Sequence, residues 1–522
     1  MSTTPRPDEV LTAFWSQTAD LWQAQARAWQ HWLEAGQTLL AQQAAAPGPW
    51  QALAQAQQQA WAQWSAGLAA ALPSAAGSGR PDKLAEAAQA NLRAALEVLT
   101  RATTTMAARL EQADPQALAS IWEGLAAEYR RDLADLPTRL QPARSEELAR
   151  LARELCTDSP SPQARRYLER FVETMRVKSV QGAEYYVDGS RVAVGPTPRE
   201  KVLEVGSLEL YRYRATADEV PAPGRPPVLL IYSIINRPWI LDLVPGFSLI
   251  AHLLSRGLDV YLVEWKPATA GCTDTLDAFL DPWLDQAVDK ACALSGHAQV
   301  GMLGYCIGGT LAAMYAARFP GKVQSLITLT TPLVSTGAGV LGLLVNPAVF
   351  PLDEIIAAHQ GVVPGKTVRH SIIAIKPYLE VLKWKAYYEN LHDERVMYLF
   401  EPVDRWANDN PDLPGEVFRA FVREVYHDDR LARGLTRVHG EPIDLRAIRC
   451  PLLNLVAAED WIVPREAAEK ITTLVGSTDA TTEIIPGPHV GIIMDPRTRP
   501  TWDRISEFVT RHAAATTAPE EA

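Results

Sequence analysis

Cysteine is scarce in this sequence, with five in 522 residues. The five are scattered along the chain, at Cys156, Cys272, Cys292, Cys306 and Cys450. No C-x-x-C pair occurs, which excludes the usual zinc-binding and thiol-redox motifs. We therefore expect a reduced, cytoplasmic protein that needs no metal and no cofactor.

Positive charge and long apolar runs are also lacking. Lys and Arg number 50 against 61 Asp and Glu, which gives a formal net charge of −11, and no basic block is present. This composition argues against nucleic acid as a partner. The N-terminus carries Asp8 and Glu9 and lacks the basic-then-apolar pattern of a secretory signal. No uncharged apolar run approaches the roughly 20 residues that span a bilayer, so we expect no transmembrane segment.

The chain has two regions of contrasting composition. The first 150 residues are rich in Ala, Gln, Leu and Trp, and Trp15, Trp22 and Trp29 recur every seven residues. This spacing places the indole rings near one face of a helix. Two interpretations stay open: the tryptophans fill the core of a helical bundle, or they form an apolar surface for a partner or a hydrophobic particle. Either one predicts an all-α N-terminal region over residues 1–150.

From about residue 205, short apolar runs alternate with helical stretches, which indicates a largely parallel sheet. A mostly helical insertion at about 332–447 separates the fifth and sixth strands, where a lid or cap would sit. These patterns predict an α/β catalytic domain over 185–515. Seven runs have the composition of strands: Leu208–Arg214, Val228–Ile234, Leu258–Glu264, Gln299–Leu303, Val323–Thr330, Pro451–Ala457 and Thr481–Ile485.

The strongest chemical motif is Gly304-Tyr305-Cys306-Ile307-Gly308-Gly309, which lies between an apolar strand and a helical stretch. It matches the nucleophile elbow of the α/β-hydrolase fold, G-x-S-x-G, with cysteine replacing serine. A tight strand-to-helix turn leaves little room for side chains, which explains Gly304, Gly308 and Gly309. The turn also puts Cys306 at a helix N-terminus, where the helix dipole favours a thiolate. The alternative is a glycine-rich turn around a buried, inert cysteine.

An acid and a base follow in the order that this fold requires. Asp460 comes directly after the strand Pro451–Ala457, and His489 follows the next strand. We expect His489 to take the thiol proton and Asp460 to orient the imidazole. Glu459 competes with Asp460 for the acid role.

Two backbone donors should stabilise an oxyanion. One is the N–H of Ile307, the residue after the nucleophile. The other should come from the loop after the strand Val228–Ile234, at Ile235 or Asn236, although Asn236-Arg237-Pro238 can also be read as an ordinary turn.

The chain resembles the polyhydroxyalkanoate synthases and is most similar to the catalytic subunit of the two-subunit, class III type. This resemblance implies the triad Cys306, Asp460 and His489. Trp461 stands where the family has histidine, which makes it a candidate for the substrate pocket, and Pro488 stands where the family has glycine. The matching stretches are Val194–Glu200, Leu210–Tyr213, Asn236–Pro238 with Asp242 and Leu243, Asp259–Leu262, Gly304–Gly309, Cys450–Asn454 and Gly487–Ile492.

The resemblance also implies an activity and a location. The family polymerises (R)-3-hydroxyacyl-CoA into polyester, with release of CoA, through an acyl group held on cysteine. It implies a cytoplasmic enzyme at the surface of a polyester granule, with a homodimer or an accessory helical protein as a possible assembly. The N-terminal region resembles that accessory subunit in composition. Two alternatives stay open: a thioesterase or intracellular polyester depolymerase of the same fold, and a non-catalytic granule scaffold.

Overall fold

The computed structural model divides the chain into two compact units. One combines Met1–Arg191 with Lys376–Glu401, and the other combines Val192–Ile375 with Pro402–Ala522. The α-helical region expected over residues 1–150 lies outside the described residues, except for two positions at its end. The structure describes residues 193–218, 224–335, 350–376, 378–427 and 429–513, with scattered positions in 147–170 and 341–346.

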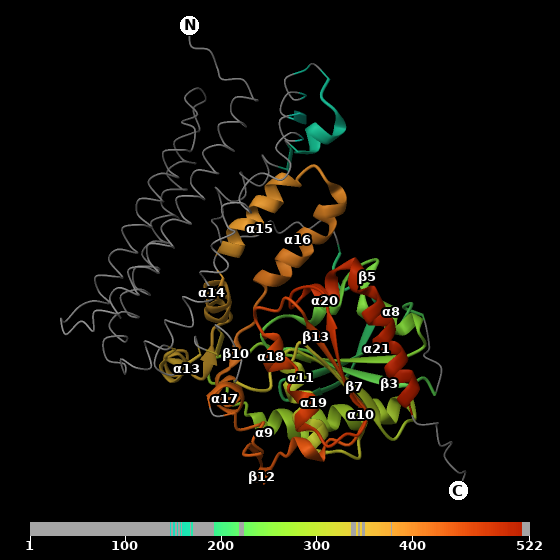
Figure 1. The fold of residues 1–522 in the computed structure, drawn as a ribbon, viewed down its shortest axis with the longest axis vertical. Helices are drawn as coiled ribbons and strands as arrows, with labels where there is room; N and C mark the ends of the chain where they lie inside the picture. The colour runs from blue at the N-terminus through green and yellow to red at the C-terminus, as the bar shows by residue number, and fades with distance from the viewer. Residues whose placement is uncertain are drawn as a thin grey trace, which may run out of the picture. The chain divides into compact units, whose positions relative to one another are not determined.

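The second unit is built on an eight-stranded sheet in the order β1-β2-β6-β3-β7-β8-β13-β14 (Figure 1). Strands β1, β2 and β6 pair antiparallel, and every pairing from β6 to β14 is parallel. All seven expected strands are confirmed, and with them the α/β fold class. The strands are β1 (Arg199–Val205), β2 (Leu208–Tyr213), β3 (Pro227–Ile231), β6 (Asp259–Trp265), β7 (Val300–Tyr305), β8 (Val323–Leu329), β13 (Leu452–Ala457) and β14 (Ala480–Ile485).

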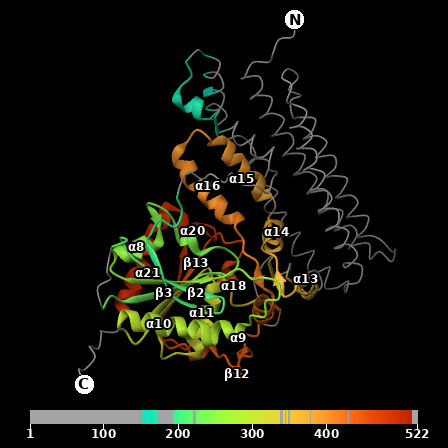
Figure 2. The same cartoon turned by 180° about the vertical axis from the view of Figure 1, so that it is seen from behind.

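Helices cover both faces of this sheet. Helices α8 and α21 pack together on one face, while α10 and α11 lie on the other (Figures 1 and 2). Helix α11 is buried at every position except Arg318, because it runs beneath the centre of the sheet. This arrangement explains why the central strands read as continuous apolar runs. The helices are α8 (Leu249–Ser255), α9 (Leu276–Ala278), α10 (Asp285–Ser295), α11 (Ile307–Arg318), α18 (Arg465–Ala468), α19 (Ile471–Leu474), α20 (Gly491–Met494) and α21 (Arg499–His512).

The insertion between β8 and β13 is mostly helical, as the sequence predicts. Its middle part belongs to the first unit, where Trp384 and Phe400 pack beside the buried Tyr387. No helix in the described part of the chain is long and apolar enough to cross a bilayer. The insertion contains α13 (Leu352–Ala358), α14 (Gly365–Ile375), α15 (Tyr378–Glu389), α16 (Glu394–Asn408), α17 (Gly415–Phe421) and the π-helical turn η3 (Val422–His427), with two short strand pairs, β9 (Val362–Val363) with β10 (Leu413–Pro414) and β11 (Arg437–Val438) with β12 (Glu441–Pro442).

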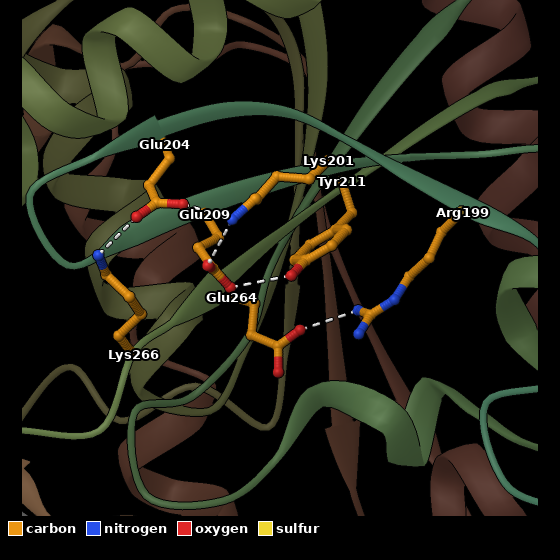
Figure 3. Close-up of polar contacts among 7 residues, drawn as sticks. All are labelled: Arg199, Lys201, Glu204, Glu209, Tyr211, Glu264 and Lys266. Atoms are coloured by element: carbon orange, nitrogen blue, oxygen red, sulfur yellow. Dashed lines mark hydrogen bonds and ion pairs between the residues drawn. The ribbon is translucent and has the colours of Figure 1, made fainter.

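Strand β1 is the one element of the large sheet that the sequence did not predict. Its seven residues are mostly charged and lie at the edge of the sheet, so they lack the apolar pattern of the other strands. Figure 3 shows how these charges are paired with those of β2 and of the end of β6. Charged side chains on an edge strand oppose the addition of a further strand from another chain. The ion pairs are Arg199–Glu264 at 2.8 Å, Lys201–Glu209 at 3.1 Å and Lys266–Glu204 at 3.0 Å.

Candidate active site

The carboxyl ends of four parallel strands meet at one edge of the sheet. Backbone hydrogen bonds continue the ladder past the strand ends, so the first residues of the loops that follow are held in fixed positions. These loops carry the candidate nucleophile, acid and base. The bonds run from the N–H of Cys306 to the carbonyl of Leu329 at 2.9 Å, from Thr330 to Leu455 at 2.9 Å and from Ala458 to Ile485 at 2.8 Å.

Cys306 sits on a strained turn between β7 and α11. Its φ of 54° and ψ of −126° lie outside the regions that L-residues usually occupy. Such a conformation costs on the order of 1–3 kcal/mol, so the surrounding packing must enforce it. The side chain is 8% exposed, which leaves the thiol at the rim of the core with limited access to water.

Three glycines make this turn possible. A Cβ atom at Gly304 would lie 2.4 Å from the Cα of Gly309, and one at Gly308 would lie 2.0 Å from the carbonyl oxygen of Ile231. A Cβ at Gly309 would lie 1.9 Å from the hydroxyl of Thr331. Helix α11 can therefore approach β3 and β8 this closely only because these positions have no side chain.

Asp460 and His489 form a buried pair. The Oδ2 atom of Asp460 lies 2.6 Å from Nδ1 of His489, and Oδ1 accepts the N–H groups of Ile462 and Val463, both at 2.9 Å. Both side chains are nearly inaccessible, at 0% exposed for Asp460 and 7% for His489. Glu459 is exposed, so of the two acids Asp460 is the one that faces the histidine.

The His489 ring is also close enough to the candidate nucleophile to interact with it electrostatically. Cys306 contributes, after Asp460, to the raised pKa of His489. Because Nδ1 is occupied by Asp460, Nε2 is the nitrogen that remains for the sulfur. The three side chains predicted as a triad thus lie close together in space, with His489 between Asp460 and Cys306.

Two stacked tyrosines support the histidine, and the sequence analysis assigned no role to either. The hydroxyl of Tyr305 donates to the backbone carbonyl of His489 at 3.1 Å, and their rings lie 5.2 Å apart. Tyr232 stacks on Tyr305 with 5.2 Å between ring centroids and an angle of 5°. Burial raises the pKa of both phenols, so they remain neutral hydrogen-bonding groups.

Tyr426, from η3 of the insertion, is buried within electrostatic range of the site. Burial raises its pKa first, and the nearby charges of Cys306 and Asp460 raise it further. The phenol therefore stays protonated. Nothing in the local sequence around Tyr426 indicates this position, because the insertion brings it to the site through tertiary packing.

The candidate oxyanion donors lie on α11 and on the loop after β3. Ile307 is the first residue of α11, so its N–H belongs to the unpaired first turn of the helix. The N–H of Ile235 donates to the hydroxyl of Ser233 at 3.2 Å, which turns it toward its own loop. Of the two residues predicted in this loop, Asn236 is therefore the better candidate for the second donor.

The remaining sequence candidates lie near or away from this centre. Trp461 is half-buried and directly follows Asp460. Two other histidines pair with other acids, His512 with Asp479 at 3.7 Å and His252 with Asp503 at 3.2 Å. Among the residues that the structure describes, no cluster of three or more His, Cys, Asp or Glu is arranged to hold a metal ion.

The charge state of His489 depends on two opposing effects. Burial disfavours the imidazolium, but the charges of Asp460 and Cys306 outweigh burial and raise the pKa of His489 well above its ordinary value. Asp460 raises the pKa of His489 more than Cys306 does, so Asp460→Asn, which removes its charge, should lower that pKa. A pH titration of ¹⁵N-labelled histidine rings by NMR measures this shift. Glu459→Gln is the matched control, because it neutralises the adjacent but exposed carboxylate and should leave the value unchanged. An unchanged pKa in Asp460→Asn would contradict this account of the pair.

Comparison with known proteins identifies the fold and the family. Residues 226–354 match the family described as alpha/beta hydrolase fold, which confirms the predicted fold. The poly(3-hydroxyalkanoate) polymerase subunit of Thiocystis violacea is 32% identical over 315 residues, which cover 60% of this chain and 87% of the relative. Its counterpart from Allochromatium vinosum is also 32% identical, with 60% of this chain and 88% of the relative covered. The Synechocystis protein of the same name is 32% identical over 58% of this chain and 81% of its own length. The chain therefore belongs to the poly(3-hydroxyalkanoate) polymerase family.

Proposed function

We propose that this chain is a polyester polymerase, an acyltransferase that joins (R)-3-hydroxyacyl units from their CoA thioesters and releases CoA. One observation carries the proposal. A cysteine on a nucleophile elbow lies within electrostatic range of the buried Asp460–His489 pair, in a chain that is 32% identical to a polymerase over 87% of that relative's length. In this proposal Cys306 is the nucleophile, His489 the base and Asp460 the group that orients the histidine.

The first half-reaction is a thioester exchange. The proton of Cys306 first passes to His489, whose raised pKa favours holding it. The sulfur then attacks the acyl carbonyl, while the carbonyl electron pair moves to oxygen. The N–H groups of Ile307 and Asn236 would stabilise this oxyanion. Collapse of the intermediate breaks the bond to the CoA sulfur, which leaves with the proton from His489. The two thioesters have nearly equal energies, so the enzyme accepts the acyl group without trapping it.

The second half-reaction forms the ester. The hydroxyl of a further monomer attacks the acyl group on Cys306, and His489 accepts the hydroxyl proton. The carbon–sulfur bond breaks, and the thiolate of Cys306 recovers the proton. An oxoester is more stable than a thioester, so this step runs downhill and favours chain growth.

Water competes with the hydroxyl at this stage. Cys306, Asp460 and His489 are each less than a tenth exposed. A site that is closed in this way limits hydrolysis of the acyl-enzyme. The burial of the triad thus supports transfer of the acyl group to a hydroxyl. Transfer to water would instead make the chain a thioesterase or depolymerase.

The product distinguishes these two activities. The purified chain, incubated with 3-hydroxybutyryl-CoA, should release CoA and form insoluble polymer together, and Cys306→Ala should abolish both. CoA release can be followed with a thiol reagent and polymer by turbidity. Release of CoA with only free 3-hydroxybutyrate in solution would instead identify a thioesterase. Full activity in Cys306→Ala would remove the proposed nucleophile.

The domain organisation and location are also proposals. We propose that residues 185–515 form the catalytic part, and that residues 1–150 attach the chain to the polyester surface or to an accessory helical protein. The chain would then act in the cytoplasm at the granule surface, either as a homodimer or with that partner. The spacing of Trp15, Trp22 and Trp29 supports this idea, because tryptophan suits surfaces that are apolar but wet at one edge.

Deletion of residues 1–130 tests the division. The shortened chain should keep acylation of Cys306 and lose much of its binding to polymer, as measured by co-sedimentation with preformed granules. Full-length Cys306→Ala is the control, because it should bind granules without making new polymer. Undiminished binding of the shortened chain would exclude the attachment role, and loss of folding would show that these residues belong to the catalytic part.

A further inference from the structure

The loop that carries the second candidate oxyanion donor is held from outside by the insertion. The indole N–H of Trp406 donates to the carbonyl of Arg237 at 2.7 Å, and the side-chain amide of Asn410 donates to the carbonyl of Ile235 at 3.2 Å. These two hydrogen bonds hold the backbone carbonyls on both sides of Asn236. We propose that Trp406 and Asn410 are positioning residues that aim the N–H of Asn236 at the oxyanion. This inference rests on the function proposed above.

The contact from Asn410 fixes a direction as well as a position. The carbonyl of Ile235 and the N–H of Asn236 belong to one planar peptide unit and point in opposite directions. When Asn410 binds that carbonyl on the insertion side, the N–H of Asn236 must point to the opposite side. Rotation of this peptide would break the hydrogen bond to Asn410.

Trp406 anchors the loop at its other end. The residue is 6% exposed, so its indole N–H is held in the core against the carbonyl of Arg237. Asp409, between the two anchors, forms an ion pair with Arg237 at 3.3 Å. The segment 406–410 thus contacts the loop on both sides of Asn236, at Ile235 and at Arg237.

The same loop begins at the end of β3, next to the nucleophile elbow, so its position bears directly on the reacting atoms. The carbonyl of Ile231 and the backbone of Tyr232 lie within van der Waals contact of Gly308 in the first turn of α11. Tyr232 stacks on Tyr305, which precedes Cys306. The loop after β3 therefore packs against the insertion on one side and against the nucleophile elbow on the other.

This arrangement predicts a selective defect. Trp406→Phe keeps the aromatic ring and removes the N–H donor, and Asn410→Ala removes the amide. Loss of a whole oxyanion donor costs roughly 10²–10³ in rate, and loosening one should cost about tenfold in the rate of acylation. The defect should appear in kcat and leave KM largely unchanged, because the oxyanion exists only after the attack.

Alkylation of Cys306 by iodoacetamide separates positioning from general damage. In that reaction the sulfur displaces iodide from a saturated carbon, so no oxyanion forms. Both variants should therefore alkylate Cys306 at the wild-type rate, while acylation by 3-hydroxybutyryl-CoA or p-nitrophenyl acetate is slowed. Fragment mass spectrometry assigns the label, because Cys292 lies in the same tryptic peptide.

Two matched controls are available in the chain. Trp502→Phe makes the same substitution at a buried indole whose N–H has no partner among the described residues. Asn408→Ala removes an amide that bonds back to Asp404 on its own helix. Both controls should acylate at the wild-type rate.

The outcomes are distinct. Slow acylation with normal alkylation in Trp406→Phe and Asn410→Ala, but not in the controls, supports the proposal. Equal effects in variants and controls, or a parallel fall in alkylation, would overturn it. If the wild type reacts with p-nitrophenyl acetate but not with the CoA thioester, the proposed function fails while the positioning role is still tested by the ester.

Discussion

The backbone of Cys306 is held at a φ of 54°, and the architecture of the site follows from that constraint. A residue in this conformation turns the chain sharply from β7 into α11 and places the side chain above the carboxyl edge of the sheet. The turn is possible only where α11 touches β3 and β8 through glycine, since a Cβ at Gly308 would lie 2.0 Å from a backbone oxygen of β3. The parallel strands then bring Asp460 and His489 to the same edge from the neighbouring loops.

Burial has two opposite effects at this edge. It would keep water away from the proposed thioester on Cys306, but it also disfavours every charge that the proposed reaction needs. Asp460 can stay charged in this buried site because its Oδ1 accepts hydrogen bonds from two backbone N–H groups while its Oδ2 faces His489. The carboxylate thereby stays hydrogen-bonded in the core and raises the pKa of the imidazole against the effect of burial. The neutral phenols of Tyr232, Tyr305 and Tyr426 complete a polar centre without adding charge.

Local sequence patterns predicted much of this arrangement and missed its long-range part. The seven apolar strands, the elbow at Cys306 and the residues after β13 and β14 all have local signals, because strand composition and turn glycines act over a few residues. Strand β1 was missed because an edge strand needs charge more than apolar character. The contact of Trp406 with Arg237 joins positions 169 residues apart, and that of Asn410 with Ile235 joins positions 175 apart. No pattern within the insertion could indicate those partners, since they are set by how the insertion folds back over the sheet.

The central claim is that Cys306 carries the growing acyl chain, and mapping of the acyl group tests it most directly. The chain is mixed briefly with 3-hydroxybutyryl-CoA, quenched in acid, digested and sequenced by mass spectrometry. The account predicts a hydroxybutyryl or oligomeric adduct on Cys306, distinguished by fragmentation from Cys292, and its removal by neutral hydroxylamine as expected of a thioester. An adduct on another residue, or polymer that accumulates while Cys306 stays unmodified at every time point, would contradict it.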